Sequence, residues 1–393
     1  MSARRSLLPA VLATAVALAG CGSEGTDLSE GPVLGKKGEE DSASVALGFP
    51  GFATKNTTRV GGADPTADAA GTALAVFAGS ASTQRPRAVT LVRDSDWQAG
   101  IAASVFMSIS VRAPVLLTAG TDMPGASADA LDALRPTGAR TLRNAQIIRI
   151  GEAARASRGR EVQVRGANPY ALAQQIDRLQ STAAGKSSDR VVIASGEQSQ
   201  FAMPAAAWAA KSGDPVLFVR RDTIPPETRA ALRAHQQPKI YVLGPPTVIS
   251  NRVLADLRKL GTVRRVSGAD PVANAIAFAR FVDGRFGWGV IDPGHGLVFA
   301  STRRPLDAAA AAPLSASGKY GPLLLTEGPR LPRPLVEYLL DIQPGYERDP
   351  VRGVYNHGWV MGDSQVISIA EQARLDSLLE IVPVTNTAQN PTR

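Results

Sequence analysis

The sequence predicts an α/β chain of three consecutive modules, each with a parallel β-sheet covered by helices. The first observation is a short box with the core Gly-Ala-Asp/Asn-Pro, which begins at three glycines spaced 104 and 102 residues apart: Gly62, Gly166 and Gly268. A second box, proline followed by aliphatic residues, recurs in phase with the first, at Pro114, Pro215 and Pro322. Two different boxes that recur in phase indicate an internal repeat of about a hundred residues, which is an ordinary domain size.

The third observation is that short apolar runs alternate with Ala-rich segments. The first repeat predicts strands at residues 88–92, 114–118 and 146–151, and helices at 67–78, 100–110 and 129–134. The second repeat predicts strands at 190–194, 216–219 and 239–244, and the third has apolar segments at 288–291, 296–299, 323–326 and 359–362. Uniformly apolar strands that alternate with helices are typical of parallel sheets covered on both faces.

The box itself is expected to begin a helix in each repeat. Its Asp or Asn is followed by proline, and this pair is typical of an N-cap residue with proline at the first helical position. The predicted caps are Asp64, Asn168 and Asp270. A ligand-binding role for the box is the alternative interpretation.

Composition and charge restrict the class of protein. The chain has 393 residues, of which 44% are hydrophobic and 20% charged, as in globular domains. Its formal charge of +8 becomes +6 when Arg4 and Arg5, in a segment expected to be removed, are discounted. This excess suits an anionic partner such as a wall polymer or a membrane surface, although it could equally serve solubility. The basic residues are scattered, so no nucleic-acid partner is expected.

The N-terminus has the anatomy of a signal peptide, with a basic start and a short apolar core. It ends in Leu18-Ala19-Gly20-Cys21, which holds the only cysteine of the chain and resembles the bacterial lipobox. That resemblance implies lipidation of Cys21 after removal of residues 1–20, with a stray cysteine as the alternative. Residues 21–57 are polar and are expected to form a flexible tether. The rest is therefore expected outside the cell membrane, anchored to it by lipid and facing the cell wall.

The repeats resemble the cell-wall-binding type 2 family over about residues 58–384. The likeness lies in the Arg-Val-Ser-Gly-Ala-Asp box of the third repeat, its Ala-rich segment 307–313, the Pro-aliphatic box at Pro322, and the Gly-Pro-Pro-Thr-Val turn that follows residue 243. The chain departs from the family pattern after the Asp of the box, where proline replaces the usual Arg-Tyr pair. The resemblance implies non-covalent attachment to anionic wall glycopolymers, and Toprim-like modules around a pseudo-threefold axis. The predicted modules are residues 58–161, 162–262 and 263–385, followed by a tail at 386–393.

Candidate binding residues are polar groups at the carboxyl ends of the predicted strands, where parallel sheets usually bind ligands. Arginine forks suit phosphate or carboxylate groups on a polymer, and each candidate could instead be a solvated loop residue. The candidates are Thr118, Arg149, Arg220, Arg221, Arg303, Arg304 and Thr326.

No catalytic residue, metal or cofactor is expected from the sequence. The three histidines, His235, His295 and His357, lack metal-ligand spacing, and no Gly-x-Ser-x-Gly elbow occurs. The sequence therefore predicts a membrane-anchored lipoprotein that binds an anionic wall polymer, and no enzyme. A substrate-binding lipoprotein of an importer is the alternative, and an extracellular enzyme with a site between modules is a third.

Overall fold

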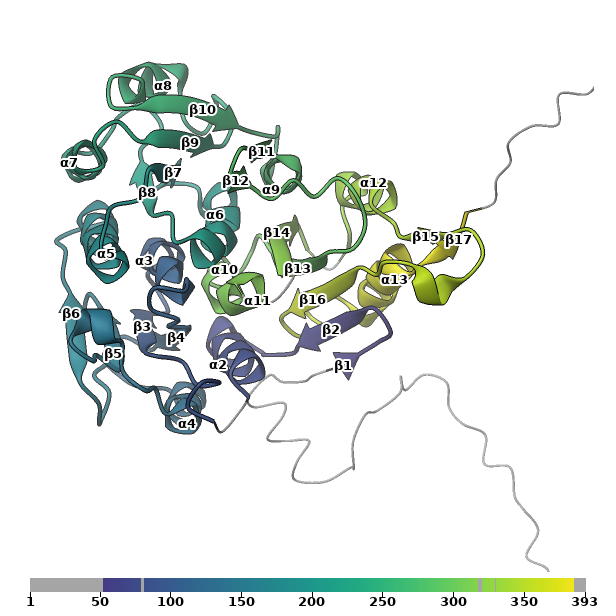
Figure 1. Cartoon of the computed structure of the whole chain (residues 1–393), viewed down its shortest axis with the longest axis horizontal. Helices are drawn as coiled ribbons and strands as arrows, with labels where there is room; N and C mark the ends of the chain where they lie inside the picture. The colour runs from purple at the N-terminus through teal and green to yellow at the C-terminus, as the bar shows by residue number, and fades with distance from the viewer. Residues whose placement is uncertain (1–51, 79–80, 317–319, 329, 385–393) are drawn as a thin grey trace, which may run out of the picture. The chain divides into compact units, whose positions relative to one another are not determined.

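The computed structural model describes residues 52–78, 81–316, 320–328 and 330–384 (Figure 1). The three largest sheets have the strand orders β4-β3-β5-β6, β10-β9-β7-β8 and β1-β2-β16-β13-β14. Every pairing in them is parallel except that of β1 with β2. The prediction of an α/β fold with parallel sheets is confirmed.

The first two sheets follow the predicted apolar runs. The first contains β3 (Val89–Arg93), β4 (Val115–Thr118), β5 (Ile147–Ile150) and β6 (Glu161–Val164). The second contains β7 (Arg190–Ser195), β8 (Val216–Val219), β9 (Lys239–Leu243) and β10 (Thr262–Val266). The central strands are buried on both faces because helices cover them, and this burial is why they read as unbroken Val, Ile and Leu.

The third sheet contains β1 (Phe52–Ala53), β2 (Thr57–Val60), β13 (Gly296–Ser301), β14 (Tyr320–Thr326) and β16 (His357–Met361). The same part of the sequence forms two small two-stranded sheets. One pairs β11 (Val282–Asp283) with β12 (Phe286–Gly287), and the other pairs β15 (Gly345–Tyr346) with β17 (Val382–Pro383). The apolar segment at 288–291 forms no strand. Its Trp288 instead meets Trp208 edge to face, with ring centroids 5.5 Å apart, so its hydrophobicity serves side-chain packing.

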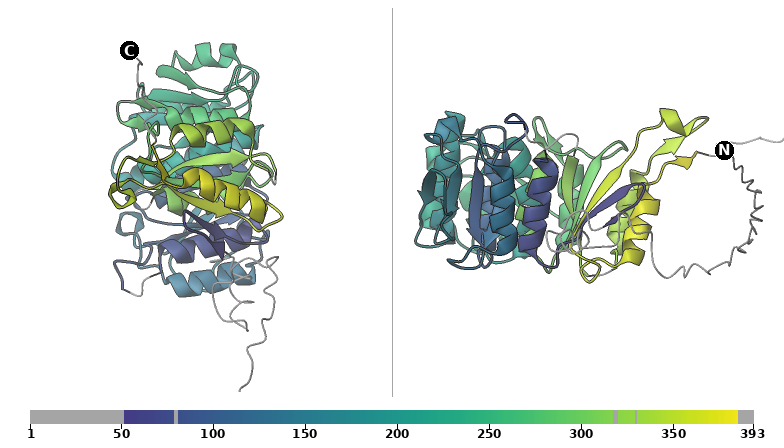
Figure 2. Two further views of the ribbon diagram at one scale, coloured as in Figure 1. Left: turned by 90° about the vertical axis from the view of Figure 1, so that its right-hand side faces the viewer. Right: turned by 90° about the horizontal axis from the view of Figure 1, so that it is seen from below.

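One strand of each large sheet comes directly before a box in the sequence, and we call it the box strand. Strand β6 pairs with β5, and β10 pairs with β9, so each box strand extends the sheet of the module before it. Strand β2, near the N-terminus of the described chain, pairs with β16 of the last module (Figures 1 and 2). The N-terminal box strand therefore belongs to the third sheet, and at each box the chain passes from a strand of one sheet to the helix that begins the next repeat.

The predicted caps of the box helices are confirmed. Helices α2 (Pro65–Val76), α5 (Pro169–Ala184) and α9 (Pro271–Arg280) begin with proline, and the preceding Asp or Asn side chain accepts a backbone N–H bond in each case. Each cap thus satisfies a donor that the first helical turn leaves free.

Ala-rich helices from the three modules pack against one another at the centre of the described fold. They are α3 (Trp97–Ala103) with the 3₁₀ turn η1 (Ser104–Met107), α6 (Ser199–Ser212), and α10 (Asp307–Ala310) with α11 (Ala312–Ala316). The helix predicted at 100–110 begins earlier, at Trp97, and continues as a 3₁₀ turn. The helix predicted at 307–313 is divided into two short helices. Small residues allow the close approach, because a Cβ at Gly100 would lie 2.8 Å from Leu306. Five further helices lie away from this centre in Figure 1: α4 (Gly125–Leu134), α7 (Pro226–Ala234), α8 (Asn251–Leu257), α12 (Arg333–Asp341) and α13 (Ile369–Leu379). Two short 3₁₀ turns are η2 (Arg140–Leu142) and η3 (Pro350–Arg352).

A side chain three residues before the glycine of each box holds the box against the preceding sheet. Arg59 is 3% exposed and donates to the carbonyls of Gly362, Asp363 and Ile367 and to the Gln372 side chain, at 2.7–2.8 Å. At the equivalent position Gln163 donates to the Gly151 carbonyl at 3.0 Å, and Arg265 donates to the carbonyls of Gly244 and Ile249. Burial lowers the pKa of Arg59 to about 10, which leaves it charged at neutral pH.

In the part of the chain that the structure describes, no helix combines the length and the apolar character needed to cross a bilayer. Cys21 and the predicted signal peptide lie outside the described residues, as does most of the predicted tether.

Candidate functional site

Three equivalent places in the fold, which we call junctions, bring a box into contact with the preceding sheet. At each junction the box helix meets the segment that follows an interior strand of that sheet. The first junction joins β3 to α5, the second joins β7 to α9, and the third joins β13 to α2. Parallel sheets usually bind ligands at the carboxyl ends of their strands, so the junctions are the places to look for a site.

A glycine is required where the box passes the helix. A Cβ on Gly62 would lie 2.6 Å from the Asp68 backbone nitrogen, and one on Gly166 would lie 2.5 Å from the Leu172 nitrogen. These separations are too short for any side chain, which explains why the box glycine recurs. The residue six positions later then faces the junction and differs in each copy: Asp68, Leu172 and Asn274.

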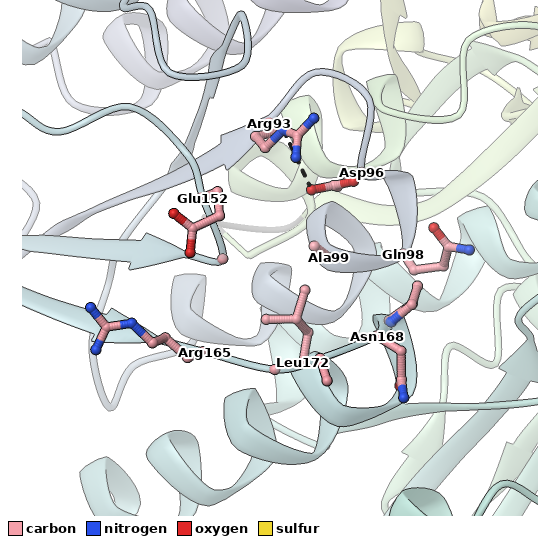
Figure 3. A pocket seen from close by; sticks show the side chains of 12 residues that line it. Arg93, Asp96, Gln98, Ala99, Glu152, Arg165, Asn168 and Leu172 are labelled. Carbon is pink, nitrogen blue, oxygen red and sulfur yellow. Dashed lines mark ion pairs between the residues drawn. The ribbon is translucent and has the colours of Figure 1, made fainter.

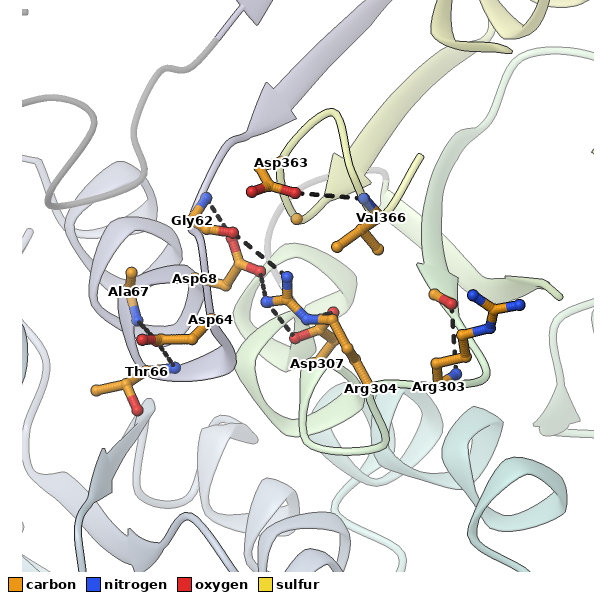
Figure 4. Close-up of polar contacts among 12 residues, drawn as sticks. Gly62, Asp64, Thr66, Ala67, Asp68, Arg303, Arg304, Asp307, Asp363 and Val366 are labelled. Atoms are coloured by element: carbon orange, nitrogen blue, oxygen red, sulfur yellow. Dashed lines mark hydrogen bonds and ion pairs between the residues drawn. The ribbon is translucent and has the colours of Figure 1, made fainter. Parts of the chain in front are cut away.

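The third junction is filled by a buried charge cluster (Figure 4). Arg304 contacts Asp68, lies 2.9 Å from Asp307 in a second ion pair, and donates to the Gly62 carbonyl at 3.3 Å. Both carboxylates are fully buried, and the Arg304 side chain is 12% exposed. Asp68 also accepts the Gly62 backbone N–H at 2.8 Å. Two carboxylates and one guanidinium thus occupy the space between α2 and α10.

Burial raises the pKa of both carboxyl groups in this cluster. Desolvation raises the pKa of Asp307 to about 7, although Arg304 opposes the shift. Desolvation together with the charge of Asp307 raises the pKa of Asp68 well above its ordinary value. The cluster therefore tends to hold a proton, as two close carboxyl groups that share one cation commonly do.

The second junction is filled by an aromatic ring. Phe201 lies six residues after the end of β7, as Asp307 lies six residues after the end of β13, so the two occupy equivalent positions. The Phe201 side chain is 5% exposed. Asn274 occupies the position of Asp68, is fully buried, and accepts the Gly268 backbone N–H at 3.4 Å. Apolar packing at this junction replaces the ion pairs of the third.

The first junction holds an open pocket of about 510 Å³ (Figure 3). By the same count, Ala99 stands at the position of Asp307, Leu172 at that of Asp68, and Asp96 at that of Arg304. Ala99 is shorter than Asp307, Asp96 is shorter than Arg304, and Leu172 carries no charge. The space that the charge cluster occupies at the third junction is therefore left unfilled at the first. We call this space the junction pocket.

The junction pocket is lined by donors and acceptors. Arg93, at the end of β3, lies 3.9 Å from Asp96 in an exposed ion pair, and Glu152 and Arg165 are exposed on the β5 and β6 side (Figure 3). The N-terminus of the 16-residue helix α5 also opens into it, and such a terminus favours anions. Carboxylates can accept sugar hydroxyls while arginines hold an acidic group, so the pocket suits an anionic carbohydrate.

Four of the seven predicted site residues lie inside the fold, three of them buried and Arg304 largely so. Thr118 is fully buried, donates to the Gly120 carbonyl and accepts the Ala154 N–H. Arg149 is 3% exposed and pairs with Glu161 at 2.8 Å, and Thr326 is fully buried. Arg304 belongs to the cluster of the third junction. Thr118, Arg149 and Arg304 make their polar contacts within the fold, and the Thr326 hydroxyl is enclosed without a hydrogen-bond partner among the described residues, so none of the four lies open to a polymer.

The other three predicted residues are exposed. Arg220 lies over the Tyr170 ring at 5.6 Å, beside α5. Arg221 pairs with Asp222 at 3.0 Å, and Arg303 lies in the loop after β13. The sequence interpretation missed Arg93 and Arg165, which line the junction pocket. Aligning the three copies position by position could have singled them out, because Ser195 and Ser301 stand at the position of Arg93, and Gly61 and Ser267 at that of Arg165.

The histidines do not form a metal site in the described residues, where no three His, Cys, Asp or Glu side chains are grouped for a metal. His235 is buried and contacts Asp177 and the Ser188 carbonyl, each at 2.8 Å. His295 and His357 are neighbours through a backbone bond of 3.0 Å, but their rings contact Asp292 and Thr58, respectively.

Three largely parallel sheets, joined by repeated boxes, define a class of repeat-built α/β proteins. Residues 163–254 match the model of cell wall binding domain 2 (CWB2), so the resemblance seen in the sequence is confirmed for this segment. The match indicates association with the cell wall, outside the cytoplasm.

The chain is also similar to known proteins over longer stretches. It is 29% identical over 167 residues to an amidase enhancer of Bacillus subtilis (strain 168), a match that covers 42% of this chain and 22% of that protein. The solved structures of Cwp6 and Cwp8 from Clostridium difficile share its fold, with TM-scores of 0.66 and 0.61 at 19% and 18% identity. Each covers 83% of this chain, which spans 48% of the Cwp6 chain and 53% of the Cwp8 chain.

Proposed function

We propose that the chain is a lipid-anchored protein of the cell envelope that binds an anionic wall glycopolymer non-covalently. The junction pocket is the binding site in this proposal, and it has a binding role without a catalytic one. The observation that carries the proposal is the combination, in one open pocket, of two arginines with two carboxylates. A polymer of sugars with acidic groups presents the complementary hydroxyls and anions.

The arrangement of the modules supports several weak contacts along one polymer. We propose Toprim-like modules related by a pseudo-threefold axis, and the support is that each box strand extends the preceding sheet, with β2 completing the third. Three exposed arginines near the carboxyl ends of strands β8 and β13 would add contacts of lower affinity: Arg220, Arg221 and Arg303. Linked weak sites increase the overall affinity without a new type of contact.

The lipid anchor is proposed from Cys21 and the residues before it. A protein with more than one acyl chain would remain with the membrane, since each buried CH₂ contributes about 0.8 kcal/mol. Replacing Cys21 by alanine is expected to move the protein from the membrane fraction to the soluble extracytoplasmic fraction, as measured by fractionation and immunoblotting. Unchanged membrane association of Cys21→Ala would contradict the anchor and leave the polymer-binding proposal intact.

The junction pocket is tested by replacing both of its arginines. Arg93→Gln with Arg165→Gln is expected to raise the Kd for purified wall at least about tenfold, because two charge-assisted contacts are lost. The matched control is Arg233→Gln with Arg252→Gln, which removes two exposed arginines of α7 and α8 and the same net charge. Equal binding by the two double variants would show that the polymer does not contact the junction pocket.

A further inference from the structure

A second pocket, of about 660 Å³, lies at the amino ends of the strands of the first sheet. Arg87 precedes β3, Arg112 precedes β4, and Arg85 and Arg140 complete its basic lining. We call it the amino-end pocket. It lies at the opposite edge of this sheet from the junction pocket, which is formed at the carboxyl ends.

In the described part of the chain, no ion pair neutralises the arginines of the amino-end pocket. None of the residues that line it is acidic, and the others are serine, threonine, glycine and asparagine. Arg87 donates to the Ile109 carbonyl at 3.0 Å, and Arg112 donates to the Thr83 carbonyl at 3.3 Å. Bonds to neutral carbonyls orient a guanidinium but leave its charge uncompensated. The pocket therefore concentrates positive charge next to hydroxyl groups.

The backbone around this pocket is unusual for the residues that it carries. Arg112 has φ +54° and Asn144 has φ +58°, and neighbouring Arg135 and Arg143 also have positive φ, at +41° and +56°. Left-handed backbone is unfavourable for residues with a Cβ, and arginine gains nothing from it. Such departures are often retained where the side chain has a function.

The second module provides an internal comparison. Strand register aligns Thr90 with Val192, and Val115 with Val216, so Arg112 corresponds to Gly213, which has φ +79°. Glycine is the residue that this backbone favours. By the same register Arg85 and Arg87 correspond to Ser187 and Asp189. The first module thus carries arginine at three positions where the second carries glycine, serine and aspartate.

We propose that the amino-end pocket binds a phosphate-bearing anion. Arginine forks match phosphate oxygens in pairs, and adjacent hydroxyls can donate to the remaining oxygens. The pocket is large enough for more than one phosphate group. This site is separate from the junction pocket and does not depend on wall-polymer binding there.

The test uses the chain from Gly22 onward, which keeps every described residue, with inorganic pyrophosphate as the probe in calorimetry at low salt. Arg87→Gln with Arg140→Gln is expected to raise the Kd at least about tenfold, because two charge-assisted contacts are lost. The control pair Arg233→Gln with Arg252→Gln is expected to change it less than about twofold, because those charges are distant and screened. Arg112→Gly is expected to weaken binding while the Tm stays within about 2 °C, because glycine suits its backbone.

A second arm identifies the source of the phosphate. The same proteins are sedimented with vesicles of phosphatidylcholine, with and without phosphatidylglycerol. Binding to anionic vesicles that is lost in Arg87→Gln with Arg140→Gln would assign a lipid headgroup, and pyrophosphate binding alone would assign a soluble phosphate. An absence of pyrophosphate binding, or equal weakening in both double variants, would overturn the proposal. The junction variant Arg93→Gln with Arg165→Gln should bind pyrophosphate normally, which separates this result from the wall-polymer function.

Discussion

Replacing Arg59 by alanine is expected to lower the free energy of unfolding by about 3–5 kcal/mol. Its guanidinium donates to three carbonyls and to the Gln372 side chain in a site that is 3% exposed. Alanine would leave these acceptors buried without a donor and would leave a cavity where the arginine was. Urea unfolding followed by circular dichroism measures the change.

The control for this variant is Arg265→Ala, at the equivalent position before the third box. Arg265 is only half-buried and donates to the carbonyls of Gly244 and Ile249. A loss of about 1 kcal/mol is expected there. If the two variants were equally stable, the attachment of β2 to the third sheet would not depend on Arg59, and this account of the link would be wrong.

Replacing Arg304 by alanine is expected to cost about 3–5 kcal/mol near pH 8, because two fully buried carboxyl groups lose their cation. The cost should shrink toward pH 5, where both carboxyls can take protons. The control Arg303→Ala, an exposed neighbour, is expected to change stability by less than about 0.5 kcal/mol. An Arg304→Ala variant with a pH-independent loss would contradict the assignment of the cluster.

The parent chain should show the matching pH dependence. The pKa of Asp307 is about 7 in the folded chain and about 3.9 in an unfolded one, so between these values the folded chain keeps a proton that the unfolded chain has released. This contribution to stability therefore falls as the pH rises from about 4 to about 7. Asp307→Asn should flatten that part of the profile, as measured from urea midpoints at pH 5 and pH 8.

The sequence predicted the central strands and the caps because both leave local signals. Leu117, Leu217 and Leu324 are fully buried in the predicted strands, and Asp64 caps its helix as expected. The three box strands were not predicted. Strand β6, for example, reads Glu-Val-Gln-Val, with partly exposed residues and little hydrophobic signal. Its place beside β5 comes from a long-range pairing that no local pattern encodes.

The failure to predict strand β6 also explains why Arg149 was proposed as a binding residue. Arg149 was expected to be a free group at a strand end, but its partner Glu161 lies on β6, which was not foreseen as a strand. Thr118 does lie at the predicted edge of the sheet. Its hydroxyl turns inward, to the Gly120 carbonyl and the Ala154 N–H, and strand position alone could not show this.

The most direct test of the proposed function is sedimentation of the chain from Gly22 onward with purified cell wall, with and without its anionic polymers, across a salt series. The account predicts binding that requires the polymers and weakens as salt rises, because the contacts are between charges. Binding to neither wall would contradict it, and so would equal binding to both that is insensitive to salt.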